Sequence, residues 1–122
     1  MPKYYHMHLE DNIIHCTFSK GLILDEDILR QAVKDRVKLA ARIARPVIID
    51  AQGLEYYTWS ARLFGSSNEA QKDVLVYAVV VNSKALLTLI NWVLAFMPPK
   101  RIPTKVFTRK EEALEWLRSF KS

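Results

Sequence analysis

The sequence predicts an α/β fold in which one mixed sheet carries helices on both faces. The strongest indication is the unbroken apolar run from Val74 to Val81. A strand that is apolar on both faces needs cover on both sides, as parallel strands in α/β proteins have. Two further observations agree: two alternating segments near the start predict a hairpin, and helical and short apolar segments alternate after it.

The hairpin joins residues 4–9 to residues 13–18 through a two-residue turn at Asp11 and Asn12. One of its faces is expected in the core and carries Tyr5, Met7, Leu9, Ile14, Cys16 and Phe18. The other face carries Tyr4, His6, His8, Ile13, His15 and Thr17, with His8 directly opposite His15.

A helix is predicted from the acidic residues after Asp25 to about residue 44, where Pro46 stops it. A short buried strand, residues 47–49, ends at Asp50. Gly53 then lets the chain turn before a second helix, placed from about residue 58 to residue 71.

After the central strand, Ser83 caps a third helix that runs to residue 97 and ends at two prolines. A last strand follows at residues 105–107. Thr108 and Glu111 then have the spacing of a capping box, which predicts a C-terminal helix that buries its apolar side chains, Ala113, Trp116, Leu117 and Phe120.

The predicted order is therefore β-β-α-β-α-β-α-β-α in one domain of residues 1–122. Right-handed crossovers give a sheet of about five strands covered by four helices, with the first strand antiparallel at an edge and the rest parallel. The loops at residues 20–24, 51–57, 82–83 and 108 then open at the carboxyl ends of the strands, where sites in such sheets form.

Composition indicates an ordinary globular protein, with 50% hydrophobic and 25% charged residues. The start lacks the apolar segment of a signal peptide, no helix is long enough to span a bilayer, and the one cysteine, Cys16, fits a reducing compartment, so we expect a cytoplasmic protein. The net charge of +5 lies in residues 62–122 and predicts no specific nucleic-acid partner.

Residues 47–54, Val-Ile-Ile-Asp-Ala-Gln-Gly-Leu, and the helix from Thr58 resemble the bacterial anti-sigma-factor-antagonist, or STAS, fold, also called SpoIIAA-like. Residues 81–83, 98–99, 103–108 and 111–117 resemble an uncharacterised bacterial branch of that superfamily. The resemblance implies a small cytoplasmic domain that works by binding a kinase or sigma regulator near a phosphorylatable serine. Ser60 takes that position here.

Ser60 and Thr58 are thus possible phosphoacceptors at a helix start, where backbone N–H groups stabilise a phosphate. The alternative is that one of them is simply the N-cap. Asp50, Asn82 and Ser83 form a predicted strand-end site, although a carboxylate that closes a strand commonly just bonds the following turn.

His6, His8 and His15 could converge and hold zinc. The face as assigned above offers no carboxylate or thiolate, so the sequence favours a solvated polar face and no metal. All three histidines lie far along the chain from Ser60, and no Gly-rich phosphate loop is present. We therefore expect neither a cofactor nor an enzyme.

The third helix has an apolar arc wider than one sheet face can bury. It could contact a second copy of the chain, a partner protein, an apolar ligand or a membrane surface, or be covered by neighbouring helices. The residues expected in this contact are Leu86, Leu89, Ile90, Trp92, Val93, Phe96 and Met97.

Two functions follow as hypotheses. The first is a non-enzymatic regulatory or protein-interaction domain that works through the strand-end loops and the helix of Ser60. The second is carriage of a lipid or other apolar small molecule between the third helix and the sheet, as in the distantly similar CRAL-TRIO fold.

Overall fold

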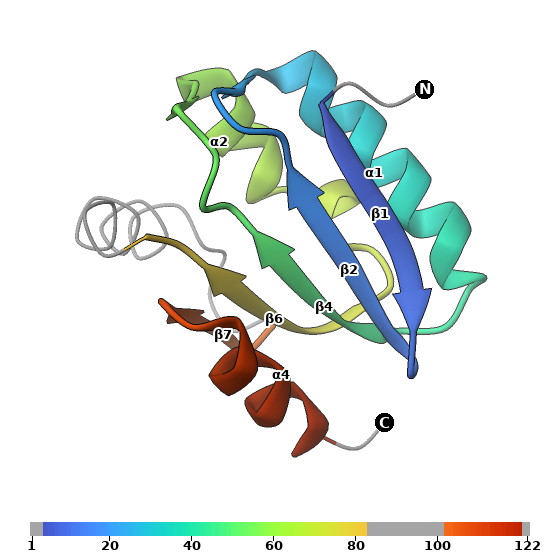
Figure 1. The fold of residues 1–122 in the computed structure, drawn as a ribbon. Coiled ribbons are helices and arrows are strands. Elements are labelled where there is room, and N and C mark those ends of the chain that lie inside the picture. Colours follow the sequence, from blue (N-terminus) through green and yellow to red (C-terminus); the bar gives the residue numbers. More distant parts are fainter. Residues whose placement is uncertain (1–3, 83–101, 121–122) are drawn as a thin grey trace.

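A computed structural model describes residues 4–82 and 102–120 (Figure 1). Its main sheet has the strand order β1-β2-β4-β6-β7. These strands are β1 (Tyr5–Glu10), β2 (Ile13–Phe18), β4 (Arg45–Asp50), β6 (Val74–Val80) and β7 (Thr104–Phe107). β1 is antiparallel to β2, and every other neighbouring pair is parallel, which confirms the predicted mixed sheet.

Helices lie on both faces of this sheet. They are α1 (Glu26–Ala40), α2 (Trp59–Gly65) and α4 (Lys110–Arg118), with a short 3₁₀ turn, η1 (Glu69–Gln71). α1 and α2 cover one face and α4 the other (Figure 1). The predicted helix of residues 83–97 lies outside the described residues, as do Ser83 and all seven side chains expected in its contact. Within residues 4–82 and 102–120, no helix could cross a membrane.

The central strand β6 is covered on both sides, as its composition requires. Val76, Ala78 and Val80 are fully buried and pack in one core cluster with Ala113 and Leu117 of α4. On the other face of the sheet, Tyr77 and Val79 of β6 line a cavity together with Leu29 and Val33 of α1. The prediction that an apolar run implies two covered faces is therefore confirmed.

The β1–β2 hairpin has the predicted turn and register. Asp11 and Asn12 have φ angles of 54° and 67°, as a two-residue hairpin turn requires. His8 pairs with His15. The expectation of a solvated second face is wrong in part, because Ile13 is buried against α4. Leu9, expected in the core, is 39% exposed, because β1 is the edge strand.

Two helices are shorter than the sequence predicts. α1 ends at Ala40, and Ala41 adopts a left-handed conformation, because the chain must reverse to enter β4 at Arg45. α2 ends at Gly65 rather than continuing to residue 71. The hydroxyl groups of Ser66 and Ser67 there donate to the carbonyls of Leu63 and Phe64, at 3.0 and 2.6 Å. Such local bonds compete with helix continuation.

The starts of two elements also differ from the predictions. The capping box before α4 does not form, because Arg109 is the N-cap residue and makes no side-chain capping bond. Pro46 lies inside β4, which is paired on both sides, so its missing N–H would cost a ladder bond. A register shift between Arg45 and Pro46 accommodates it.

A second sheet, which the sequence does not predict, joins two of the strand-end loops. β3 (Ile23–Leu24) pairs in parallel with β5 (Tyr56–Tyr57). Gly53 permits this close approach, because a Cβ at this position would lie 2.8 Å from the Cα of Lys20. We call this two-stranded sheet the ribbon.

Candidate functional site

The carboxyl ends of the parallel strands meet at one edge of the sheet. Thr17, Asp50, Val80 and Phe107 follow one another in register across β2, β4, β6 and β7. The loops after these strands therefore open together, as predicted from the strand order.

Asp50 and Asn82, two of the three predicted strand-end residues, both hold the turn after β4. The Asp50 Oδ1 accepts hydrogen bonds from the backbone N and the Nε2 of Gln52, at 3.1 and 3.2 Å. The Asn82 Nδ2 donates to the Gln52 carbonyl at 3.3 Å. Asp50 thus bonds the turn that follows its strand, which is the alternative to a binding role given in the sequence analysis.

Thr58 and Ser60 have different roles at the start of α2. The Thr58 Oγ1 accepts a hydrogen bond from the Ala61 N–H at 3.2 Å, so Thr58 is the N-cap. Ser60 is exposed, with its Oγ 3.4 Å from the Thr58 Oγ1. This arrangement leaves the Ser60 hydroxyl accessible, and its role as a phosphoacceptor stays a prediction.

Four large apolar side chains stand exposed on the ribbon and α2. Ile23 and Tyr56 are cross-strand partners and are 54% and 49% exposed. Trp59 and Leu63, one turn apart on α2, are 58% and 50% exposed. The two elements adjoin, because the N–H of Thr58 donates to the Leu24 carbonyl at 3.0 Å. We call these four residues the ribbon–α2 surface.

Arg62 belongs to the same region of α2. Its guanidinium carbon lies 5.9 Å from the centre of the Trp59 ring, and its Nε donates to the Tyr57 carbonyl at 3.2 Å. Sequence reasoning singled out Ser60 and overlooked the apolar residues beside it. The available signal was the spacing of Trp59 and Leu63, which places both on one helix face.

A cavity of about 170 Å³ lies between the sheet and the two helices α1 and α2. Its lining includes Phe18, Leu29, Val33, Ile49, Tyr57 and Tyr77. Burial raises the pKa of Tyr57 to about 12 and also raises the pKa of Tyr77. Both phenols therefore stay neutral at physiological pH. Because the other side chains named above are apolar, the cavity is apolar as a whole.

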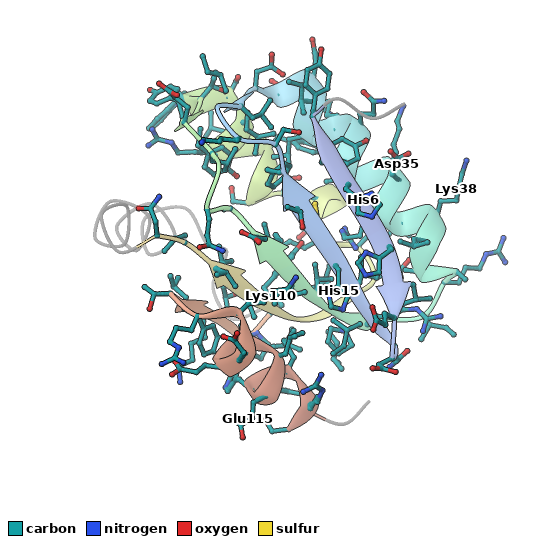
Figure 2. The ribbon with its side chains drawn as sticks, viewed as in Figure 1. His6, His15, Asp35, Lys38, Lys110 and Glu115 are labelled. Atoms are coloured by element: carbon teal, nitrogen blue, oxygen red, sulfur yellow. The ribbon has the colours of Figure 1, made fainter. Side chains whose placement is uncertain are left out.

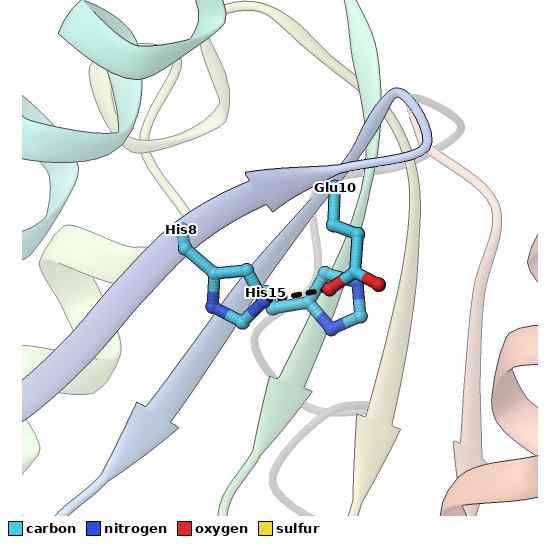
Figure 3. Close-up of side chains that lie close together, drawn as sticks. All are labelled: His8, Glu10 and His15. Atoms are coloured by element: carbon cyan, nitrogen blue, oxygen red, sulfur yellow. Dashed lines mark hydrogen bonds and ion pairs between the residues drawn. The ribbon is translucent and has the colours of Figure 1, made fainter.

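A third group of functional side chains lies on the β1–β2 hairpin (Figure 3). His8, Glu10 and His15 place one potential ligand atom each within 4.8 Å of one another. Glu10 is not among the residues predicted for the face that carries the histidines. Strand alternation places Glu10 beside His8, so the premise that this face offers no carboxylate is wrong.

The electrostatic surroundings of this cluster are mixed. The pKa of His15 is lowered, first by burial, then by His8 and by Lys110 of α4. Figure 2 shows that His6, His15 and Lys110 lie on the same side of the sheet as α4. The nearby thiol of Cys16 lies in the core on the opposite face of β2, where burial raises its pKa to about 12.

The fold is that of a SpoIIAA-like α/β domain. The chain is similar to the crystal structure of an uncharacterised DUF3478-family protein with a SpoIIAA-like fold from Shewanella loihica PV-4. The TM-score is 0.63 and the sequence identity 17%, over 93% of this chain and 91% of that chain.

The family model "Domain of unknown function (DUF7793)" matches residues 7–121, and the chain belongs to this family. No curated protein matches the sequence. The likeness in fold confirms the predicted SpoIIAA-like fold and leaves the function to be inferred from the chain's own surfaces.

Proposed function

We propose that this chain is a non-enzymatic interaction domain that binds a partner protein through the ribbon–α2 surface. The observation that carries the proposal is the exposure of four large apolar side chains, two of them aromatic, on adjoining elements. Clustered exposed apolar groups mark interaction sites, and interface cores are enriched in aromatic residues and arginine. Arg62 beside Trp59 fits this composition.

Ser60 is the residue through which such docking would be regulated. It lies between Trp59 and Leu63 in the sequence of α2 and is exposed. A phosphate there would add up to about two negative charges that the partner must desolvate or pair. We expect phosphorylation to weaken an apolar contact. Phosphate on Ser60 in cells, lost in Ser60→Ala, is the finding that supports this role.

The proposal is tested by quantitative affinity capture from the organism that encodes the chain. Wild type is compared with Trp59→Ala combined with Leu63→Ala, and each captured protein is quantified by mass spectrometry. Truncation of central aromatic contacts commonly costs more than about 2 kcal/mol, so the specific partner should fall at least tenfold in the double variant. Its direct binding to the purified chain is then measured by calorimetry.

Ile43 and Tyr4 provide the matched control. They are 51% and 43% exposed, which is close to the exposure of the test residues, but they lie outside the ribbon and α2. The Ile43→Ala, Tyr4→Ala variant should capture the partner as wild type does. Equal loss in both variants, or no loss in either, would contradict the assignment of this surface.

A second candidate function is binding of a small apolar molecule in the cavity between the sheet and α1 and α2. The cavity volume of about 170 Å³ favours it. A cavity of about 150 Å³ holds benzene, whereas sites for larger ligands run from about 300 Å³ upward. The expected ligand is therefore the size of one aromatic ring, which is smaller than the lipid first considered.

Native mass spectrometry of the full chain, purified without detergent, distinguishes this candidate. A bound mass that disappears in Val33→Trp, which fills the cavity from α1, would support it. Unliganded protein that also shows no thermal shift with benzene or indole would exclude it.

A further inference from the structure

The β1–β2 hairpin holds three metal-binding side chains in a fixed register. His8 and His15 are paired residues, and Glu10 lies two residues beyond His8 on the same face of β1. The tight turn at Asp11 and Asn12 prevents slippage between the strands. The three side chains therefore converge because of the backbone pairing itself.

The distances in this cluster suit one small cation. The Nε2 of His8 lies 3.3 Å from the Oε1 of Glu10 (Figure 3). Ligands at zinc–ligand bonds of about 2.0–2.1 Å with tetrahedral angles lie about 3.3 Å apart, which matches this separation. The potential ligand atoms of all three residues lie within 4.8 Å of one another, so the remaining pairs must close by at most about 1.5 Å for one ion to contact all three.

The second ring nitrogen of His8 is in a different environment from the Nε2 that faces Glu10. The Nδ1 of His8 is buried and has no hydrogen-bond partner among the described residues. Its ring is stacked on the His15 ring, with centroids 4.6 Å apart and planes 15° apart. An ion held between the His8 Nε2 and Glu10 would leave this Nδ1 as the N–H donor of the ring, the position that metal-bound histidines use for an outer hydrogen bond. Two imidazoles face to face are also poorly arranged to satisfy each other.

We propose that His8, Glu10 and His15 bind one divalent transition-metal ion of the zinc class. Two imidazole nitrogens and one carboxylate oxygen form a donor set that zinc uses in sites with an open fourth position. A water would occupy that position, because His8 and Glu10 are 43% and 65% exposed at their side chains. The site is separate from the ribbon–α2 surface and does not depend on the proposed partner.

The site is tested on the full-length chain with any affinity tag removed, because tag histidines bind the same ions. Zinc chloride is titrated into chelator-treated protein in competition with a chromophoric zinc indicator. We expect one ion per chain with micromolar affinity. Glu10→Gln and His15→Gln should each weaken binding by at least about tenfold, the lower end for losing even an outer partner of a metal site.

Two controls make the result specific. His6→Gln removes an imidazole whose ring is 5.5 Å from the His8 ring but which lies outside the cluster, and Cys16→Ala removes the thiol on the other face. Both should stay within about threefold of wild type, well short of the tenfold or greater loss expected for a ligand.

Nitrogen-detected NMR of the imidazole rings gives an independent readout, because zinc should shift ring resonances of both His8 and His15. If His15→Gln fails to fold, the zinc affinity of Glu10→Gln and the zinc-dependent shifts in this spectrum decide whether the three residues bind the ion. No saturable binding in the micromolar range overturns the proposal. So does equal affinity in wild type and Glu10→Gln, or a loss confined to His6→Gln.

Discussion

Arg36 is the one buried charged residue in the described part of the chain, at 4% exposure. Its Nη1 and Nη2 donate to the carbonyls of Lys72 and Ala70, at 2.7 and 2.9 Å. These bonds tie α1 to η1 and to the approach to β6. A buried guanidinium is tolerated here because carbonyl oxygens satisfy it.

Arg36→Met keeps most of the side-chain volume and leaves both carbonyls without this donor. Because the two hydrogen bonds to this charged group contribute about 1.5–3 kcal/mol each, we expect the free energy of unfolding to fall by about 3–6 kcal/mol. Urea denaturation followed by circular dichroism measures this change. Lys34→Met, on the exposed side of α1, is the control and should shift stability by less than about 0.5 kcal/mol. Equal effects of both substitutions would contradict the role given to Arg36.

Tyr57 gives the protein a defined sensitivity to alkaline pH. Its folded-state pKa is raised to about 12, because burial disfavours the phenolate. Above its ordinary value of about 10, the unfolded chain loses this proton while the folded chain keeps it, so stability falls as pH rises from about 10 to 12.

In Tyr57→Phe the free energy of unfolding should therefore fall less steeply over this range. The slope does not vanish, because the raised pKa values of Tyr5 and Tyr77 remain. Urea midpoints at pH 9, 10 and 11 measure it, with Tyr4→Phe, at an exposed position, as the control. A slope in Tyr57→Phe as steep as that of wild type would refute this assignment.

Single residues also show what could be predicted from the sequence alone. The pairing of His8 with His15 followed from turn chemistry and strand alternation, and is confirmed. The same alternation, carried one step further, would have added Glu10 to that face. The role of Arg36 could not be predicted, because its carbonyl partners are more than thirty residues away along the chain.

At the scale of elements, the ribbon brings two strand-end loops into contact and supports the start of α2. The Gly21 N–H donates to the Gly53 carbonyl at 2.7 Å, and the Glu55 N–H donates to the Leu22 carbonyl at 2.8 Å. The position of Tyr56 and Trp59 on the surface therefore depends on how closely these loops approach.

Gly53→Ala would place a Cβ 2.8 Å from the Cα of Lys20 and 3.1 Å from its N. The loops must then separate, and we expect a loss of about 1–3 kcal/mol, as for other overpacked sites. Thermal unfolding measures the loss, and amide exchange should rise in residues 20–24 and 53–57.

The comparison variant is Gly21→Asn, in the facing loop. Gly21 has a φ of 80° and open space around its Cα, and asparagine tolerates left-handed backbone better than other residues. Gly21→Asn should therefore cost less than Gly53→Ala. A Gly53→Ala protein with unchanged stability and exchange would show that the contact is not tight.

The length of each element was harder to predict than its existence. All five predicted strands of the main sheet and three of the predicted helices are present. Each buries one or two faces in the core, and this burial imposes the apolar pattern from which the element was predicted. Helix ends instead depend on local competition, as with the hydroxyls of Ser66 and Ser67. The ribbon was missed because a pairing of two residues per strand leaves almost no periodic signal.

At the scale of the whole molecule, the candidate sites lie in two regions, because the cavity adjoins the ribbon and α2 through Leu24, Tyr57 and Gly65. The ribbon–α2 surface lies at the carboxyl ends of the strands, the apolar cavity lies under α1 and α2, and the proposed metal-binding cluster lies on the edge hairpin. The hairpin cluster and the ribbon–α2 surface share no residue, so substitutions in one leave the side chains of the other in place. Metal binding and partner docking can therefore be tested one at a time.

The most direct test of the central claim is site-specific photo-crosslinking in living cells of the source organism. A photoreactive amino acid replaces Leu63 in one strain and Ile43 in another, two positions that are 50% and 51% exposed. We predict a discrete adduct with one partner protein from position 63 and none from position 43. No adduct from position 63, or the same adducts from both positions, would contradict a docking surface on the ribbon and α2.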